Sequence, residues 1–396
     1  VTTGPGGTNA LTGLASAWLD SIPCLFISGQ ARSEDAKALQ HIRQSGSQHL
    51  DITNVVSPIT KSCYQIKENP NEINSILKLI ENDLFNERPG PVWLDIPLEF
   101  QWADIKSEEK IIGTQSPKKE KFPDIVNKDI SLAKRPVFVL GYGCRLANKH
   151  YQFINFCKKH RIPYVLTWNT LDYSSYEEPE NCGLIGISGT RDANLVIEYS
   201  DLVIGIGTHL SKMLTGDSLS NFASNAKTVY ILDIDKDESI RFENNQRYKY
   251  INYDLKTTDI NSISSPTNMK DDWINLYTKL KNLRDYEIIN ECQKSIPPNS
   301  INQYSIYNIF NNKLKDDDVL VIDGGGNVLF SALQSIKLKN NNRLITGAGI
   351  GCMGSGIPEA IGAAFATNKR VFCFIGDITI LLSSTLSFFA LGEAHC

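Results

Sequence analysis

Glycine-rich turns that stand close to a carboxylate are the feature of this 396-residue chain best suited to chemistry. Three glycines follow Asp323 directly after an apolar run and lead to Asn327. Five more glycines lie between positions 347 and 356, ahead of an alanine-rich stretch. Because glycine lets a backbone approach a ligand closely, these two turns predict a cradle for a diphosphate.

A further carboxylate stands in the next turn along the chain. Gly376 and Asp377 follow the apolar run at 371–375, so the Asp377 side chain should lie at the carboxyl end of a strand. Open α/β sheets bind ligands at that edge, and Mg²⁺ prefers one carboxylate together with phosphate oxygens. A single Gly-Asp pair is usually an ordinary turn, but three such features in one block indicate a site.

The chain opens on another glycine turn, at positions 4–9, which ends in Asn9. A close approach to a ligand and a tight turn into a helix explain this pattern equally well, and Asn9 could be a helix N-cap. Two further turns, at 141–143 and 205–207, have a Gly-x-Gly pattern but no third glycine. A dinucleotide site of the usual kind is therefore not expected there.

Periodicity divides the chain into three α/β blocks joined by polar connections. We expect domains at 1–105, 127–285 and 298–396, with a charged linker at 106–126. Apolar runs separated by helical patterns predict parallel, doubly wound sheets, with helices on both faces. In the central block, the expected strands lie at 136–141, 163–168, 202–207 and 228–235.

Composition excludes several classes of protein. A formal net charge of -4 gives no electrostatic basis for binding nucleic acid or an anionic membrane. The six histidines are scattered, and the nine cysteines include no CxxC pair, so we expect reduced thiols in a cytoplasmic protein. No apolar run reaches the length of a membrane span.

The spaced motifs together resemble the thiamine-diphosphate-dependent acetolactate synthase family, the acetohydroxyacid synthase large subunits. The resemblance covers nearly the whole chain. It is carried in order by the motifs TGPGGTN at 3–9, QHLDI at 48–52, RPGPVWLDIP at 88–97, GTRDAN at 189–194, GCMGSGIP at 351–358 and GD at 376–377. It implies three domains along the chain, in the order pyrimidine-binding domain, central domain and diphosphate-binding domain.

The resemblance also implies that this chain is a fragment that lacks both ends, with the first and third domains truncated. The glutamate that activates the cofactor in the family would precede residue 1. Ile378 stands where the family has glycine, and no asparagine follows Asp377, although the family's metal motif continues to one. By itself such a fragment is expected to be inactive.

Site residues are carried over at matching positions. Gln48 and Met353 would have catalytic roles, Met353 as the wedge beneath a bent cofactor, and Asp377 would hold the metal. His49 stands beside Gln48 where an acidic residue is usual. The cofactor would be bound by Gly4, Pro5, Gly6, Asn9, Gly325, Gly326, Asn327, Gly351, Cys352, Met353, Gly376, Ile378 and Thr379.

The implied activity is decarboxylation of a 2-oxo acid such as pyruvate, followed by carboligation to a second carbonyl, as in branched-chain amino acid biosynthesis. Thiamine diphosphate and Mg²⁺ would be the cofactors, whereas FAD is not expected because residues 208–212 lack the family's arginines. A homodimer or homotetramer would form its active sites between subunits. Two alternatives stay open: a divergent carboligase acting on a keto-sugar or another 2-oxo acid decarboxylase, and a catalytically inactive homologue or gene remnant.

Overall fold

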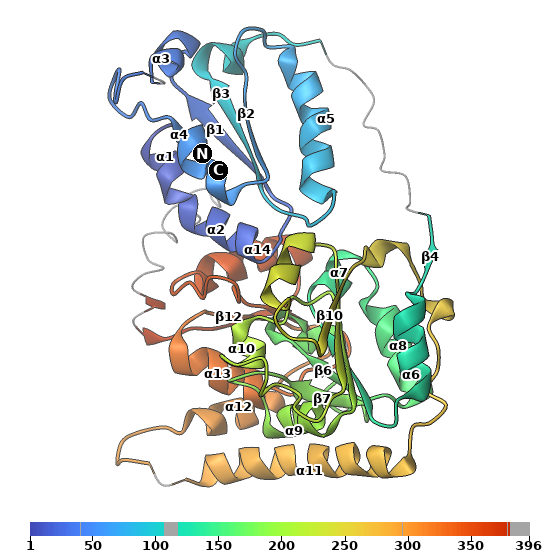
Figure 1. Ribbon diagram of the computed structural model, residues 1–396. Helices are drawn as coiled ribbons and strands as arrows, with labels where there is room; N and C mark the ends of the chain where they lie inside the picture. Colours follow the sequence, from blue (N-terminus) through green and yellow to red (C-terminus); the bar gives the residue numbers. More distant parts are fainter. Residues whose placement is uncertain (40, 107–117, 295, 378, 381–396) are drawn as a thin grey trace. The chain divides into compact units, whose positions relative to one another are not determined.

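Parallel β-sheets organise both parts of the chain in the computed structural model (Figure 1). The structure describes residues 1–39, 41–106, 118–294, 296–377 and 379–380. These form two units, Val1–Ser116 and Pro117–Cys396, which are described separately below. The parallel pairing of strands confirms the predicted α/β class.

The first unit has a three-stranded parallel sheet in the order β1-β3-β2. Its elements are α1 (Pro5–Asn9), α2 (Leu11–Leu19), β1 (Leu25–Gln30), α3 (Ser33–Ala38), α4 (Ile52–Val56), β2 (Ser62–Gln65), α5 (Glu72–Phe85) and β3 (Val92–Pro97). Short 3-10 turns, η1 (Ser57–Ile59) and η2 (Leu98–Trp102), complete it. Apolar residues at helical spacing in 72–84 form α5, and the apolar run at 92–96 forms β3.

The side chains of central strand β3 alternate between the two faces of the sheet, and helices cover both faces. Val92 and Leu94 pack against Ile76 and Ile80 of α5. Trp93 points the other way, where α2 and α4 cover it, and its side chain is fully buried. Its indole N–H donates to the Ser28 hydroxyl, 2.8 Å away, so the one polar atom of this ring is satisfied.

The second unit holds a six-stranded parallel sheet, in the order β10-β9-β8-β5-β6-β7. Its strands and helices are β4 (Glu120–Lys121), α6 (Asp124–Leu132), β5 (Pro136–Leu140), α7 (Gly143–Leu146), α8 (His150–His160), β6 (Tyr164–Leu166), β7 (Asn181–Leu184), α9 (Arg191–Tyr199), β8 (Leu202–Ile206), α10 (Lys212–Thr215), β9 (Thr228–Asp233), β10 (Tyr248–Asn252), β11 (Thr258–Asp259) and α11 (Asp271–Gln293). The 3-10 turns are η3 (Trp168–Tyr173), η4 (Lys236–Arg241), η5 (Leu255–Thr257) and η6 (Ile260–Ser262).

A second parallel sheet of this unit has the strand order β13-β12-β14. The glycine turns at 324–326 and 347–356 follow two of its strands. Its elements are α12 (Gln303–Asn311), β12 (Val319–Ile322), α13 (Gly326–Ser335), β13 (Arg343–Ile345), α14 (Gly356–Thr367) and β14 (Val371–Phe374). The apolar run that precedes Asp323 forms β12, and the predicted strand at 371–375 is confirmed as β14.

Part of the stretch expected to be a linker is structured. Strand β4 pairs with β11, and Phe122 is buried in the core below the six-stranded sheet. Helix α6 begins at Asp124. The charged composition of 106–126 did not indicate this structure, because Phe122 is the one aromatic residue by which the segment packs against the core. Residues 107–117 lie outside the described residues.

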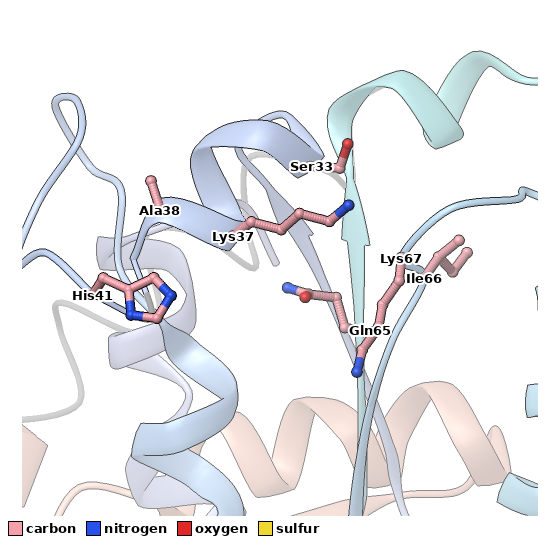
Figure 2. Close-up of a pocket in the computed structure, with 7 residues that line it drawn as sticks. All are labelled: Ser33, Lys37, Ala38, His41, Gln65, Ile66 and Lys67. Carbon is pink, nitrogen blue, oxygen red and sulfur yellow. The ribbon is translucent and has the colours of Figure 1, made fainter.

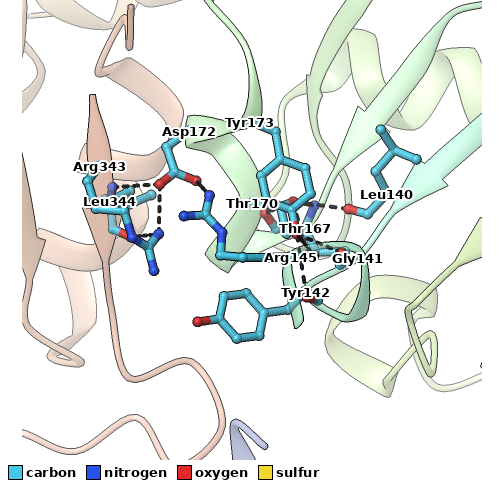
Figure 3. Close-up of polar contacts among 10 residues, drawn as sticks. All are labelled: Leu140, Gly141, Tyr142, Arg145, Thr167, Thr170, Asp172, Tyr173, Arg343 and Leu344. Atoms are coloured by element: carbon cyan, nitrogen blue, oxygen red, sulfur yellow. Dashed lines mark hydrogen bonds and ion pairs between the residues drawn. The ribbon is translucent and has the colours of Figure 1, made fainter. Parts of the chain in front are cut away.

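A buried carboxylate joins the two sheets of the second unit (Figure 3). Asp172, whose side chain is fully buried, accepts hydrogen bonds from Arg145 at 2.6 Å, Arg343 at 2.7 Å and the backbone N–H of Leu344 at 2.9 Å. Arg145 follows β5, whereas Arg343 begins β13. Moving the two sheets apart would leave a buried charge without its partner, which is costly. This contact therefore fixes the two sheets to each other.

Candidate functional site

Three turns of the second unit meet at one edge of the β13-β12-β14 sheet. Residues 323–325 follow β12, residues 346–355 follow β13, and residues 375–377 follow β14. All three strands are parallel, so their carboxyl ends lie on the same side. The predicted diphosphate and metal residues of this block therefore share a single edge, where open α/β sheets bind ligands.

Asp323 links two of these turns. Its side chain is fully buried, and its Oδ1 accepts hydrogen bonds from the backbone N–H of Gly354 at 3.0 Å and of Gly356 at 2.9 Å. Its Oδ2 has no hydrogen-bond partner in the described structure. Asp323 is thus the anchor for the turn that carries Met353, which is 54% exposed.

Glycine is required where the turns touch. A Cβ on Gly324 would lie 2.5 Å from the carbonyl carbon of Gly351 and 2.8 Å from the amide nitrogen of Cys352, so the two backbones are in direct contact. A Cβ on Gly325 would meet Thr379 at 3.2 Å and Met353 at 3.7 Å. A side chain at Gly324 would therefore push the two backbones apart, whereas one at Gly325 would need only a small shift of the Thr379 side chain.

The start of α13 faces open space. Gly326 has a φ of 45°, and a Cβ built on it would meet no atom within 4 Å. No side chain caps the first turn of α13, and Gly326 and Asn327 are exposed. The first backbone N–H groups of a helix have no intrahelical partner and carry partial positive charge, so this ten-residue helix offers donors to an anion. The residues present therefore fit a diphosphate group.

Asp377 lies at the same edge. It is exposed, and it directly follows Gly376, whose carbonyl oxygen accepts a 2.6 Å hydrogen bond from the Thr379 hydroxyl. Within the described ranges, no group of three or more His, Cys, Asp or Glu side chains could hold a metal ion. A single carboxylate suits Mg²⁺ only where phosphate oxygens complete the shell.

In the first unit, the opening turn and the predicted Gln48 lie together. A Cβ on Gly4, which has a φ of 61°, would be 2.6 Å from the carbonyl oxygen of Gln48. Gln48 itself has a φ of 64°, and its carbonyl accepts a 3.4 Å hydrogen bond from the Thr3 hydroxyl. Asn9 ends α1 rather than capping a helix.

A buried polar network fixes these two loops to the sheet. The Gln30 side chain accepts from the Thr3 hydroxyl at 3.1 Å and donates to the Leu50 carbonyl at 2.9 Å and to Asp95 at 3.1 Å. Asp95 also accepts from Ser28 and Gln65. Burial raises the pKa of Asp95, although these side-chain hydrogen bonds act to lower it.

The glycine turns of the six-stranded sheet pack against each other. A Cβ on Gly141 would lie 2.2 Å from the carbonyl oxygen of Gly207, and the Gly143 N–H donates to that oxygen at 2.9 Å. The following loop, 208–212, has no arginine, and the guanidinium of Arg241 binds the backbone carbonyls of residues 209 and 210.

The structure brings the predicted residues together in two groups, one in each unit. Asp323 lies with the group of the second unit, although it was not predicted as a site residue. The only sign of its role in the sequence is its position directly before the three glycines. Ile378 lies outside the described residues. The first group consists of Gly4, Pro5, Gly6, Asn9 and Gln48, and the second consists of Gly325, Gly326, Asn327, Gly351, Cys352, Met353, Gly376, Asp377 and Thr379.

Comparison with known proteins gives matches along the whole chain. Models of the thiamine pyrophosphate enzymes match residues 1–55 (N-terminal TPP binding domain), 125–248 (central domain) and 324–387 (C-terminal TPP binding domain). The acetolactate synthase isozyme 1 large subunit of Escherichia coli K12 is 28% identical over 391 residues, which cover 96% of this chain and 65% of that protein.

Other relatives agree. The acetolactate synthase large subunit of Lactococcus lactis is 30% identical over 95% of this chain, and a probable acetolactate synthase large subunit of Methanococcus aeolicus is 29% identical over 95%. The chain spans 64% of the length of each of these two relatives. Because all three domain models match in order, the chain belongs to the thiamine pyrophosphate enzyme family and is similar throughout to the large subunits of acetolactate synthase.

Proposed function

We propose that this chain is part of an enzyme that uses thiamine diphosphate to decarboxylate a 2-oxo acid such as pyruvate and to join the remaining two-carbon unit to a second 2-oxo acid. The observation that carries this proposal is the meeting of three turns around Asp323 at one sheet edge. The relatives named above, which are acetolactate synthases, support the same reaction.

The residues of the second unit would bind the charged end of the cofactor. Backbone N–H groups at the start of α13, from Gly326 and Asn327, would donate to diphosphate oxygens, because no side chain uses them. Asp377 would bind Mg²⁺ together with those oxygens, which neutralises charge that the protein itself does not balance. Gly376 and Thr379 would form the adjoining turn.

Met353 would support the reactive part of the cofactor. Its side chain lies beside Gly325 and is 54% exposed, so it has room to pack against a bound ring. The backbone of Gly351 and Cys352 would accept and donate hydrogen bonds there. Bound thiamine diphosphate supplies the electron sink that makes decarboxylation of a 2-oxo acid possible, and the protein supplies position and exclusion of water.

Gln48 would present a polar group to the substrate, and Gly4, Pro5, Gly6 and Asn9 would shape the pyrimidine site of a neighbouring subunit. A homodimer or homotetramer is part of this proposal. The rigid attachment of both loops through Gln30 and Asp95 supports a positioning role for them. FAD is not part of this proposal. The loop at 208–212 has no arginine, and the nearby Arg241 guanidinium already donates to backbone carbonyls of that loop.

The test is cofactor binding by the purified chain. Calorimetric titration with thiamine diphosphate and Mg²⁺ should show saturable binding that chelation of Mg²⁺ weakens. Asp377→Ala should weaken it at least about tenfold, the equivalent of about 1.4 kcal/mol, whereas Asp317→Ala, at an exposed position of the same unit, should not. Absence of saturable binding, or equal affinity in both variants, would contradict the assignment. Release of CO₂ from pyruvate by the full-length protein then tests the reaction.

A second candidate keeps the cofactor and changes the acceptor, for example to a keto-sugar. The residue after Gln48 is His49, whose ring is 2.7 Å from the Ser45 hydroxyl and close to Gly46. An imidazole here presents a different surface from the acidic side chain that the family usually has. Comparing 2-oxobutanoate with a keto-sugar as acceptor, at a fixed pyruvate concentration, distinguishes the two candidates.

A further inference from the structure

A cavity of about 520 Å³ opens in the first unit, at the carboxyl end of β2 (Figure 2). One wall is formed by α3 and the turn after it, which contribute Ser33, Lys37, Ala38 and His41. The other wall is Gln65, Ile66 and Lys67. This volume lies within the range of small-molecule sites, and the ends of parallel strands are where such sites form.

The lining of the cavity is cationic. Figure 2 shows the Lys37 side chain extending toward Ser33, with Lys67 beside Gln65 on the other wall. No carboxylate lines the cavity, and neither lysine forms an ion pair with any described residue. Two ammonium groups on facing walls create a positive potential between them, which the Glu72 carboxylate near Lys67 offsets only in part.

Nearby carboxylates are already occupied by other donors. Glu99 accepts from the Ser33 N–H at 2.9 Å, and Asp95 accepts from the Gln65 amide at 2.9 Å. Glu72 accepts the backbone N–H groups of residues 67–69. Each of these carboxylates orders a wall of the cavity, and none of the three is among the residues that line it.

We propose that this cavity binds the phosphate or carboxylate group of a small anionic molecule. Lys37 and Lys67 would make charge-assisted hydrogen bonds to its oxygens, while the second N–H of the Gln65 amide adds a neutral one. Ile66, which is 3% exposed, closes the base. All of these residues belong to the first unit, whereas the turns around Asp323 belong to the second.

Ligand binding here is connected to the loop that carries Gln48. The Gln65 amide and the Gln30 amide donate to the same oxygen of Asp95, and Gln30 accepts from Thr3, whose hydroxyl also contacts the Gln48 carbonyl. An anion that draws Gln65 toward the cavity would change one of the hydrogen bonds that set this network. The site is therefore placed to sense an anion next to a functional loop.

The experiment uses the chain without thiamine diphosphate or Mg²⁺, so its outcome is independent of the proposed function. Inorganic phosphate, succinate and neutral glucose are titrated by calorimetry at low salt. In parallel, lysine acetylation is mapped by mass spectrometry at saturating probe. We expect phosphate or succinate, but not glucose, to protect Lys37 and Lys67, and the stronger probe identifies which oxyanion the site prefers.

A matched control is available on α5, where Lys78 is exposed and does not line the cavity. Replacing both Lys37 and Lys67 by Ala should weaken anion binding about tenfold or more, whereas Lys78→Ala should leave it unchanged. Equal protection of Lys78, or unchanged affinity in the double variant, overturns the proposal. Protection is measured on the unaltered chain, so that result stands even if the double variant unfolds.

Discussion

Replacing Asp323 is the sharpest test of how the candidate cofactor edge is built. In the native structure one carboxylate oxygen accepts two backbone N–H groups, from Gly354 and Gly356, at 3.0 and 2.9 Å. Asp323→Ala removes that oxygen and leaves both donors without a partner. Asp323→Asn keeps a carbonyl oxygen of the same shape at the same place, and its amide group replaces the Oδ2 that has no hydrogen-bond partner.

The size of the effect follows from burial. Asp323 is 0% exposed, so water does not replace the lost oxygen without rearrangement. Each buried donor left unpaired costs about 1–3 kcal/mol, so Asp323→Ala should destabilise the turn by about 2–6 kcal/mol. For Asp323→Asn we expect about 1 kcal/mol or less, because the acceptor is retained and a buried charge with one bare oxygen is removed.

Hydrogen exchange is the suitable assay, since the chain has more than one unit and a single unfolding free energy is not well defined for it. A peptide that contains residues 351–356 reports the Gly354 and Gly356 amides directly. Each 1.4 kcal/mol of lost protection corresponds to about tenfold faster exchange through local opening. Asp323→Ala should therefore accelerate exchange at least about tenfold, with Asp323→Asn close to the native rate.

Two results would refute this account of Asp323. If Asp323→Ala leaves exchange unchanged, the carboxylate does not hold the turn. If Asp323→Asn is as damaging as Asp323→Ala, the negative charge or the second oxygen matters more than the two amide contacts, and the residue has a role beyond positioning. The exchange readout needs no bound cofactor, so neither result depends on catalytic activity.

Two further predictions concern stability. Arg284 and Asp192 form a buried ion pair between α11 and α9, so Arg284→Met should lower the protection of α9 and α11 amides against hydrogen exchange by about 3–5 kcal/mol. Arg191→Met, at a mostly exposed arginine, should lower it by less than about 1 kcal/mol, and similar losses in both variants would contradict the burial argument. Burial lowers the pKa of His150 to about 4, so the unfolded chain binds a proton that the folded chain does not, and stability should fall between about pH 6.5 and pH 4. His150→Gln should flatten that part of the melting-temperature profile, and an unchanged slope would assign it to other groups.

Strands with strong apolar runs were predictable, and strands without them were not. Four runs in the central block indicated β5, β6, β8 and β9, but β7 and β10 escaped notice. Strand β7 has the sequence Asn-Cys-Gly-Leu, and all four residues are buried, so its position in the sheet overrides weak local propensity. Helix α13 was also missed because it begins with a glycine, which is a poor helix former.

Contacts between distant polar residues left no mark in the sequence. The Arg284–Asp192 pair joins residues 92 positions apart, and the Asp323 carboxylate binds backbone N–H groups, which every residue except proline possesses. Sequence patterns report periodicity and residue type, but they do not report which backbone groups a side chain will reach. The glycines around Asp323 were predictable because close backbone contact restricts those positions to one residue type.

A position restricted to glycine does not by itself indicate a ligand site, as two glycine turns of this chain show. Gly141 and Gly326 both follow a strand and both look suited to approach a ligand. A Cβ on Gly141 would collide with the Gly207 backbone, so that glycine allows two protein loops to touch each other. A Cβ on Gly326 would meet nothing, so its amide faces open space at the start of a helix. The first is explained by packing alone, whereas the second leaves exposed, uncapped donors that an anion or water can bind. The distinction depends on what lies opposite the glycine, and the fold of distant segments decides that.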